Sequence, residues 1–541
     1  MKNISIIYKI LFVAVLSLVS ANLALAQSEL QPYSYQFYQK LSPDLYSTKT
    51  REHTSIKPLI IDSVLKSHYD SLMNSGNDGK QHSLLYKKIF NEHLLDYKGS
   101  NSTFYTDLLP DVAVGRDFSG KRNTYTNAIG LQLGGSISDK FQYNVSGYLN
   151  NAVVPDYLST YIQQVGIVPG QAYAKTYGTN GYSWSYITAV VSYTPIKYLN
   201  ISAGRDKTFI GDGYRSMLLS DYASPYPFLK LTGTLGNVRY MVMWTDMNDP
   251  AYTSQYGISR HKFGVFHYLD WNVSNRLSFG FFENIMGFFT DDNGAKRPFD
   301  FNYINPIIFL KPVNNSSADP DKSLLGLTGK YKLTDGITVY GQFALNEFVS
   351  KDFFSSNGAS VNKYGWQLGI RGANLFGVKN LNYLLESNNA KPYTYSARSA
   401  IENYSNNSEP LAHPWGANFR ELVGMLNYSY KRFDFSGEFD YGHYGLDTAG
   451  MNYGKDIFQL YTSPARLFGN YTGQGLTTNM YYLEGKVAYL LNPKYNLRIE
   501  LGGIFRQEQN AQFKDRTTML TIGLRSSFRQ LYSDLASYRT H

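Results

Sequence analysis

Two polar, glycine-rich segments hold the side chains that are best suited to bind a ligand. The first, 204–227, carries alternating charges and three glycines, and it ends in aromatic and proline residues. Arginine forks can hold a carboxylate or vicinal hydroxyls, and glycines let the backbone fold tightly. A salt-bridge network that pins a loop is the alternative interpretation. The candidate residues of this segment are Arg205, Asp206, Asp212, Arg215 and Asp221.

The second segment, 413–421, places a tryptophan among charged and amide side chains. An aromatic ring can pack against the apolar face of a sugar while neighbouring polar groups bind its hydroxyls. A tryptophan that only anchors a loop is the alternative. The candidates are His413, Trp415, Asn418, Arg420 and Glu421, with Glu347 at a predicted strand end as a weaker one.

Both segments fall at the same end of the fold predicted below, so loops from distant strands can meet there. We therefore expect one polysaccharide-binding cluster, made of Arg205, Asp212, Arg215, Trp415 and Arg420. Tyrosines on a neighbouring loop are further candidates for stacking on a sugar: Tyr393, Tyr395 and Tyr404.

Signatures of enzymes are missing from the sequence. It contains no GxSxG elbow, no HExxH zinc helix, no phosphate-binding GxxxxGK[ST] loop and no GxGxxG. Isolated histidines such as His261, His267 and His443 are more often hydrogen-bonded structural residues than catalytic ones. The sequence predicts a binding protein with no catalytic residue, no cofactor and no metal.

The composition narrows the class of protein that could carry these segments. Aromatic residues make up 16% of the 541 residues, and charged residues make up 17%, below the roughly 25% of soluble domains. Disorder, a disulfide scaffold and a polytopic helical membrane protein are each disfavoured, because the chain is aromatic, has no cysteine and lacks repeated long apolar runs. The net charge of +9 suits an acidic polysaccharide or lipid head groups, but it is too diffuse to indicate nucleic acid.

The N-terminus has the features of a secretory signal peptide. Lys2 and Lys9 form a basic region before an apolar run, Ile10 to Val19, and Ala24-Leu25-Ala26 forms a cleavage site before Gln27. An uncleaved N-terminal anchor is the alternative. The sequence thus predicts a signal peptide over residues 1–26 and an exported protein that resides in the outer membrane.

Residues 27–109 differ from the rest of the chain. Apolar residues recur at helical spacing between Ser55 and Gly76, and again between Ser83 and Asp96. Helices this short are not stable alone, so each must dock on another part of the protein. We expect a small helical segment that plugs the periplasmic mouth of a barrel.

From about residue 110 the hydrophobic pattern alternates with a period of two, and connections alternate between short and long. Eighteen strands are predicted: 110–117, 125–136, 140–149, 182–194, 198–206, 226–232, 236–245, 259–271, 276–290, 323–333, 336–347, 363–371, 378–387, 419–430, 433–443, 479–490, 496–506 and 516–528. The prediction is an all-β protein, an 18-stranded antiparallel outer-membrane β-barrel over 110–530, followed by a periplasmic tail over 531–541.

Several of these stretches resemble a known family. They are the 204–227 segment, the Asn305-Pro306 step, the strand end from Tyr340-Gly341-Gln342 to Asn346-Glu347-Phe348, and His413-Pro414 with Gly416-Ala417-Asn418. Together they are similar to the capsule-assembly family typified by Wzi, and most of all to its bacteroidete branch of RemB-like gliding motility proteins. The resemblance implies an 18-stranded barrel plugged by helices and loops, and a non-enzymatic lectin that tethers capsular polysaccharide to the cell surface. Asn346-Glu347 stands where a family member has an acidic pair, so the sugar specificity stays open.

Three functions remain in competition. The first is a barrel that binds or tethers capsular or other surface polysaccharide, with membrane lipid as its surroundings. The second is an anchoring component of gliding motility or of the adhesin secretion machinery, whose partners are outer-membrane, motility or secretion proteins. The third is a diffusion porin, which a plug would exclude.

Overall fold

The computed structural model describes residues 29–61, 63–138, 140–249, 260–290, 295–297, 301–310, 322–347, 349, 351–352, 357–448, 450–529 and 531–538. The predicted signal peptide, 1–26, lies outside these ranges. No helix within them is long and apolar enough to cross a membrane.

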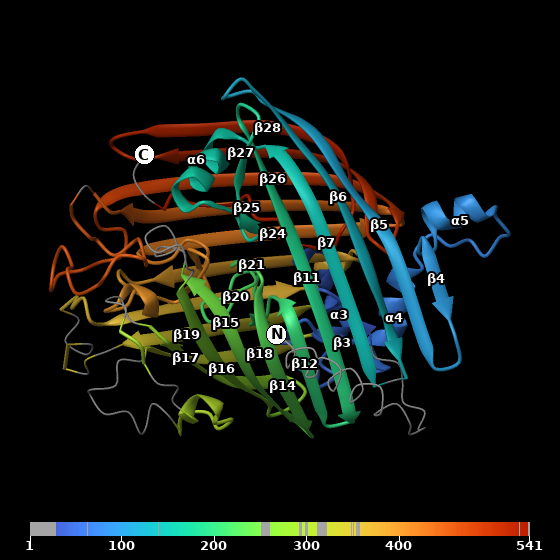
Figure 1. Cartoon of the computed structure of the whole chain (residues 1–541), viewed down its shortest axis with the longest axis horizontal. Coiled ribbons are helices and arrows are strands. Elements are labelled where there is room, and N and C mark those ends of the chain that lie inside the picture. The colour runs from blue at the N-terminus through green and yellow to red at the C-terminus, as the bar shows by residue number, and fades with distance from the viewer. Residues whose placement is uncertain are drawn as a thin grey trace, which may run out of the picture.

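Eighteen long antiparallel strands of the described chain form a closed barrel (Figure 1), because β28 pairs with β5 and β7 pairs with β11. The strands are β5 (Ser102–Asp117), β6 (Arg122–Ile137), β7 (Phe141–Val153), β11 (Gly181–Ile196), β12 (Leu199–Asp206), β14 (Tyr226–Leu235), β15 (Val238–Asp249), β16 (Arg260–Asn272), β17 (Leu277–Phe288), β18 (Lys322–Thr334), β19 (Ile337–Glu347), β20 (Lys363–Gly372), β21 (Leu381–Ala390), β24 (Phe419–Tyr430), β25 (Phe433–Leu446), β26 (Leu476–Asn492), β27 (Leu497–Gln509) and β28 (Lys514–Arg525). Each overlaps one predicted strand, so the 18-stranded barrel is confirmed.

The strands place apolar side chains on the outer face of the wall and polar or small side chains on its lumen face. Along β5, Val112 and Val114 point outward and are exposed, whereas Asp111 and Ala113 are buried on the lumen side. A wall that presents leucine, isoleucine, valine and phenylalanine outward matches the hydrocarbon core of a bilayer, where every backbone group must be paired within the barrel. Connections at one end, the short-turn end, are brief. Most of those at the other, the long-loop end, are extended, and the four-residue connections 118–121 and 510–513 are the exceptions.

The N-terminal segment is less helical than its periodicity indicates. The predicted helix from Ser55 to Gly76 begins only at Ser63, and the predicted second helix stops at Phe90. Backbone pairing explains the difference, since Ile56–Lys57 and Ile60–Ile61 are short strands that pair with other segments. The elements are β1 (Glu29–Leu30), α2 (Tyr35–Tyr38), η1 (Gln39–Leu41), α3 (Ser42–Leu45), β2 (Ile56–Lys57), β3 (Ile60–Ile61), α4 (Ser63–Met73), α5 (Leu84–Phe90) and β4 (Leu95–Lys98).

Two predicted boundaries need correction. The first barrel strand begins at Ser102, so the end of the segment predicted to be a plug belongs to the wall. Residues 531–538, predicted to be a periplasmic tail, return into the lumen, where Tyr532, Leu535 and Tyr538 are buried. The buried contacts of this tail explain its path. The Ser537 hydroxyl, for example, donates to Glu508 Oε2 near the end of β27 at 2.7 Å.

Four segments of the chain fill the lumen: the N-terminal residues 29–61, the loop 207–225, the loop 391–418, and the described parts of the tail, 526–529 and 531–538. They share one apolar cluster with the barrel wall, which includes Ile56, Leu218, Trp415 and Ala536. Short elements support the loops: α6 (Asp156–Val165), β8 (Ile167–Val168), β9 (Ala172–Tyr173), β10 (Lys175–Tyr177), β13 (Phe209–Ile210), η3 (Phe301–Ile304), η4 (Leu375–Gly377), η5 (Ala400–Glu402), β22 (Ser405–Asn406) and β23 (Glu409–Pro410).

A closed barrel of this kind resists detergent until it is heated, because opening it would break a whole ladder of backbone hydrogen bonds at the seam between β28 and β5. We expect unboiled and boiled samples of the protein to migrate differently in a detergent gel. Identical migration of the two samples would contradict a closed wall.

Candidate functional site

The loop 207–225 enters the lumen and brings Arg215 to its centre. Gly211 has a positive φ of 140°, and a Cβ on Gly213 would come within 2.1 Å of a Glu386 carboxylate oxygen. The glycines therefore let the loop backbone reach the barrel wall. The backbone N–H groups of Tyr214 and Arg215 donate to the two oxygens of Glu386 on β21, at 3.0 and 3.1 Å.

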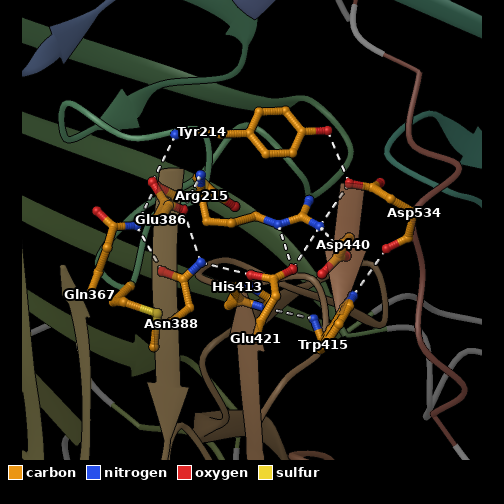
Figure 2. Close-up of polar contacts among 12 residues, drawn as sticks. Tyr214, Arg215, Gln367, Glu386, Asn388, His413, Trp415, Glu421, Asp440 and Asp534 are labelled. Carbon is orange, nitrogen blue, oxygen red and sulfur yellow. Dashed lines mark hydrogen bonds and ion pairs between the residues drawn. The ribbon is translucent and has the colours of Figure 1, made fainter. Parts of the chain in front are cut away.

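Arg215 is almost completely buried, and it binds carboxylates from two wall strands and from the tail (Figure 2). Its Nη2 lies 2.9 Å from Glu421 Oε1 on β24, 2.7 Å from Asp534 Oδ2 in the tail and 3.6 Å from Asp440 Oδ2 on β25. Its Nε also donates to Glu421 at 3.0 Å. One guanidinium thus ties a loop, the wall and the C-terminal tail together.

The carboxylates around Arg215 compensate its buried positive charge, so replacing this arginine should destabilise the fold. Burial by itself would lower the pKa of Arg215, but the carboxylates of Asp534 and Glu421 outweigh that effect and raise its pKa well above the usual value. Removing one partner from a buried ion pair typically costs about 3–5 kcal/mol, since the remaining charges are left unpaired. We refer to Arg215, Glu421, Asp440 and Asp534 as the lumen lock.

Amides on the wall complete the lock. Asn388 Nδ2 donates to Glu386 at 2.9 Å and to Glu421 at 2.7 Å, and Gln367 Nε2 donates to the Arg215 carbonyl at 2.9 Å. The Tyr214 hydroxyl donates to Asp534 Oδ2 at 3.0 Å. These side chains come from neighbouring strands of the wall and from the loop, so the buried polar groups of the loop backbone find fixed partners.

His413 and Trp415 join the lumen lock from the loop 391–418. His413 Nε2 lies 2.7 Å from Glu421 Oε2, and the Trp415 backbone N–H donates to His413 Nδ1 at 3.2 Å. This pattern fits a neutral imidazole with its proton on Nε2. The Trp415 indole N–H donates to the Asp534 carbonyl at 3.1 Å, and its ring is fully buried. Trp415 therefore anchors a loop, which is the alternative to sugar binding that the sequence left open. Its buried ring has no face that a sugar could reach.

Asp212 forms a separate anchor toward the N-terminal segment. It accepts hydrogen bonds from the Tyr46 hydroxyl at 2.9 Å, the Ser55 hydroxyl at 3.0 Å and the Thr54 hydroxyl. Burial would raise the pKa of Asp212, but the positive charges of Lys330 and Lys57 and the hydrogen bond from Thr54 outweigh it and hold the pKa well below its usual range. Asp212 therefore joins the N-terminal segment to the loop 207–225.

Asp221 and Asn418 also hold loops, and Asp206 lines cavities in the lumen. Asp221 accepts a hydrogen bond from the Tyr532 hydroxyl at 2.6 Å, and Asn418, with a positive φ of 56°, donates to the carbonyls of Gly445 and Gln474. Asp206 lies at the end of β12 and lines small lumenal cavities together with Lys207.

Glu347 lies at the end of β19 beside a solvent-exposed arginine. Its carboxylate is 2.6 Å from Lys363 Nζ and 3.5 Å from Arg398 Nη2, and the side chain of Arg398 is 68% exposed. The Tyr461 hydroxyl accepts from Arg398 Nε at 2.7 Å. Glu347 and the Tyr461 hydroxyl thus both contact the guanidinium of Arg398, which solvent can reach.

The expectation of a single cluster of five residues is not met. Arg215 and Trp415 meet at the lumen lock, but Asp212 belongs to the other anchor. Arg205 and Arg420 occupy outward positions of β12 and β24, because side chains alternate along a strand and their neighbours in sequence point inward. Arg205 donates to the Ile187 carbonyl at 2.7 Å on the outer wall.

The tyrosines that were predicted to stack on a sugar are also buried. Tyr393, Tyr395 and Tyr404 each have less than 4% of their surface exposed. The hydroxyls of Tyr395 and Tyr404 donate to the carbonyls of Met217 and Leu218, at 2.8 and 2.6 Å. They hold the loop 391–418 against the loop 207–225.

Of the carboxylates that receive Arg215, the sequence indicated Glu421 but not Asp440 or Asp534. Asp440 lies on the predicted strand 433–443, and Asp534 lies in a segment that was predicted to be a periplasmic tail outside the barrel. The alternation along β25, with aromatic residues facing out and Glu438 and Asp440 facing in, is the signal that could have revealed the first. Asp534 has no comparable signal in the sequence.

A cavity of about 240 Å³ separates the tail from the wall at β5, β6 and β25–β28. Its lining is mixed, with carboxylates such as Glu438 and Glu500 beside cations such as Lys486 and Arg498. Within the described ranges no group of three or more histidine, aspartate or glutamate side chains is arranged to hold a metal ion.

We expect the lumen lock to keep the tail protected from proteases. Arg215→Met removes the cation and leaves three carboxylates buried, so residues 526–538 and the loop 207–225 should be cleaved at least tenfold faster in limited proteolysis. Asp534→Asn should have a smaller effect in the same direction. Asp246→Asn, which changes an exposed ion pair with His261, is the matched control. Equal cleavage of all three variants and the unmodified protein would show that the lock holds nothing in place.

Acid should loosen the same region through His413. Burial, opposed by Glu421, lowers the pKa of His413 to about 4. The folded state thus favours the neutral ring, and its contribution to stability is present above about pH 6.5 and is lost as the pH falls toward 4. Protease sensitivity of the loop 391–418 should therefore rise between pH 6.5 and 4. His413→Gln should blunt this rise, and His443→Gln on the outer wall should not; a rise unchanged in His413→Gln would rule out His413 as its source.

Comparisons with known proteins agree with the fold. No protein-family model and no curated protein matches the chain. Among solved structures, the chain is similar to Wzi, an outer-membrane protein of Escherichia coli that is involved in group 1 capsule assembly and is described as a carbohydrate-binding β-barrel. The TM-score is 0.56 at 12% identity, over 93% of this chain and 100% of that one. The chain also aligns with OprD of Pseudomonas aeruginosa, with a TM-score of 0.41 and 12% identity over 82% of this chain and 98% of that one. It aligns with OccAB2 of Acinetobacter baumannii with a TM-score of 0.42 and 9% identity, over 79% of this chain and 99% of that one. At these identities the likeness to Wzi establishes the barrel fold, and the two lower scores carry no argument.

Proposed function

We propose that this chain is a plugged outer-membrane barrel that binds surface polysaccharide at its long-loop end, without catalysis. The observation that carries the proposal is the filled lumen. Arg215, Asp212 and Asp534 tie two loops, the N-terminal segment and the tail into the interior by buried ionic contacts. A porin would need that space for solutes, whereas a rigid filled lumen offers a fixed platform on which long loops can present a binding surface.

The structural likeness to Wzi and the family resemblance of the 204–227 and 413–421 segments support a carbohydrate as the ligand. The buried candidates, Arg215, Trp415 and Glu421, then act indirectly by holding the platform. Direct contact falls to groups that solvent can reach at the long-loop end.

Glu347, Arg398 and Tyr461 supply the chemistry that a sugar contact needs. The exposed guanidinium of Arg398 can donate paired hydrogen bonds to vicinal hydroxyls or to a uronic acid carboxylate. Its orientation is fixed by the Tyr461 hydroxyl and by Glu347, so little side-chain entropy remains to be lost on binding. Phe468 and Tyr471, on the loop that carries Tyr461, are further aromatic rings exposed to solvent at the long-loop end.

The test is binding of the purified protein to an array of the host's own surface polysaccharides. We expect binding, and we expect Arg398→Ala to weaken it about tenfold, since a charged hydrogen bond contributes roughly 1.5–3 kcal/mol when it is shielded from water. Lys379→Ala, an exposed cation in a short turn, is the matched control and should bind as the unmodified protein does. Absence of binding to any host polysaccharide would contradict the proposed function.

Exposed leucines on α5 favour a second candidate function, the anchoring of protein partners. Helix α5 and strand β4 project from the short-turn end (Figure 1), and the exposed fractions of Leu84 and Leu85 are 77% and 72%. Large exposed apolar side chains that lie together often mark a docking surface. A role in motility or adhesin secretion would use this surface, and it becomes the better account if the polysaccharide array shows no binding.

A further inference from the structure

The outer wall carries an unusual group of cations at the long-loop end. Lys514 and Arg516 on β28 and Arg116 on β5 occupy outward positions, because the residues between them in sequence, such as Asp515 and Asp117, face the lumen side. Strands β28 and β5 are direct neighbours, with Leu520 opposite Arg116. We call Arg116, Lys514 and Arg516 the rim cations.

The rim cations border directly on the apolar outer wall. On β28, the exposed side chains of Leu520 and Ile522 follow on the same face, and Val112 and Val114 do the same on β5. A strand rises about 3.3 Å per residue, so Arg516 lies on the order of 13 Å along its strand from Leu520. Because Arg116 lies opposite Leu520, the rim cations extend over on the order of 20 Å, from the edge of the apolar outer wall to the long-loop end of β28.

The nearby carboxylates do not neutralise the rim cations. Asp515 is paired with the inward Arg506 at 3.0 Å, and Glu508 and Asp117 are buried on the lumen side. The outward neighbours of Lys514 and Arg516 on β27 are the amides Gln509 and Gln507. Arg116 donates to Asn123 at 2.7 Å, and Arg516 lies 5.1 Å from the centre of the Phe505 ring. The described outward face of these strands thus combines three cations with amide side chains and holds no acid.

Arg205 on β12 and Arg420 on β24 are two further, single cations on the outward face. Both were predicted to bind polysaccharide, and both point outward at the long-loop end. Arginine on a lipid-facing wall is unfavourable in the hydrocarbon and tolerable only near the interface, where an anionic group can meet it. Planar guanidinium groups are especially suited to bidentate contact with phosphate.

We propose that the rim cations form a lateral binding site for the phosphorylated head group of a glycolipid in the leaflet that surrounds the long-loop end. The site continues the lipid-facing surface of the barrel and matches a phosphate in charge, while Gln507, Gln509 and Asn123 offer hydrogen bonds to the sugar hydroxyls of the head group. An acidic polysaccharide has the right charge too, but it would reach these side chains only from above, whereas a lipid head group lies beside them.

Native mass spectrometry of the full chain in detergent tests the site. The probes are a bis-phosphorylated diglucosamine glycolipid, the same lipid without phosphate, inorganic phosphate, and polygalacturonate as an acidic polysaccharide. We expect the phosphorylated lipid to bind at least tenfold more tightly than each of the other three. Lys514→Ala with Arg516→Ala should lose that preference, and adding Arg116→Ala should lower the affinity further.

The matched control is Lys197→Ala with Lys379→Ala, which removes the same charge from exposed turns at the other end and should retain binding within about twofold. All of these side chains lie on the outside of the barrel, so a heat-modifiable band confirms that each variant is folded. The proposal is overturned if the Lys514 and Arg516 variant binds the phosphorylated lipid as tightly as the unmodified protein does. It is also overturned if the dephosphorylated lipid, free phosphate or polygalacturonate binds equally well.

Discussion

The buried contact between Arg215 and the carboxylates of Glu421, Asp440 and Asp534 is the constraint on which the interior depends. A guanidinium placed in the middle of a barrel must be paired, because an isolated buried charge would cost far more than a folded domain can tolerate. Its partners come from two wall strands and from the C-terminal tail. The same contact therefore fixes the register of a loop against the wall and brings the tail back into the lumen.

The surrounding polar groups extend this constraint outward. Glu386 and Asn388 on the wall bind the loop backbone and Glu421, and His413 links Glu421 to the loop that carries Trp415. A buried network of ion pairs and hydrogen bonds of this kind favours one arrangement of the loops, since separating Arg215 from its carboxylates would leave buried charges unpaired. The long-loop end can then present a stable outer surface, while the wall outside it remains free to interact with the membrane.

Much of the wall could be predicted from the sequence, because each strand carries its own alternating pattern and each short turn its own signal. All eighteen strands appear in this way, even though individual ends shift by several residues. The interior was harder to predict. Ile56 and Ile60 have helical spacing but pair as short strands with distant segments, so long-range pairing outweighs the local preference.

In the candidate site, too, local sequence patterns indicated some residues, whereas long-range contacts decided their role. The sequence drew attention to Arg215, His413, Trp415 and Glu421, and these do meet, but their burial makes them parts of a lock. Strand parity alone could have placed Arg205 and Arg420 on the outer wall, since their sequence neighbours face inward. Asp534 could not be foreseen, because its pairing depends on a tail whose path no local pattern records.

The central claim is that the protein fills its own lumen, and the conductance of the unmodified chain in a planar lipid bilayer tests it most directly. A barrel of eighteen strands without a plug would carry a steady, large ionic current. The account predicts that insertion produces no stable open channel, because the two loops, the N-terminal segment and the tail stay in place. A persistent current of porin size from the intact protein would contradict it.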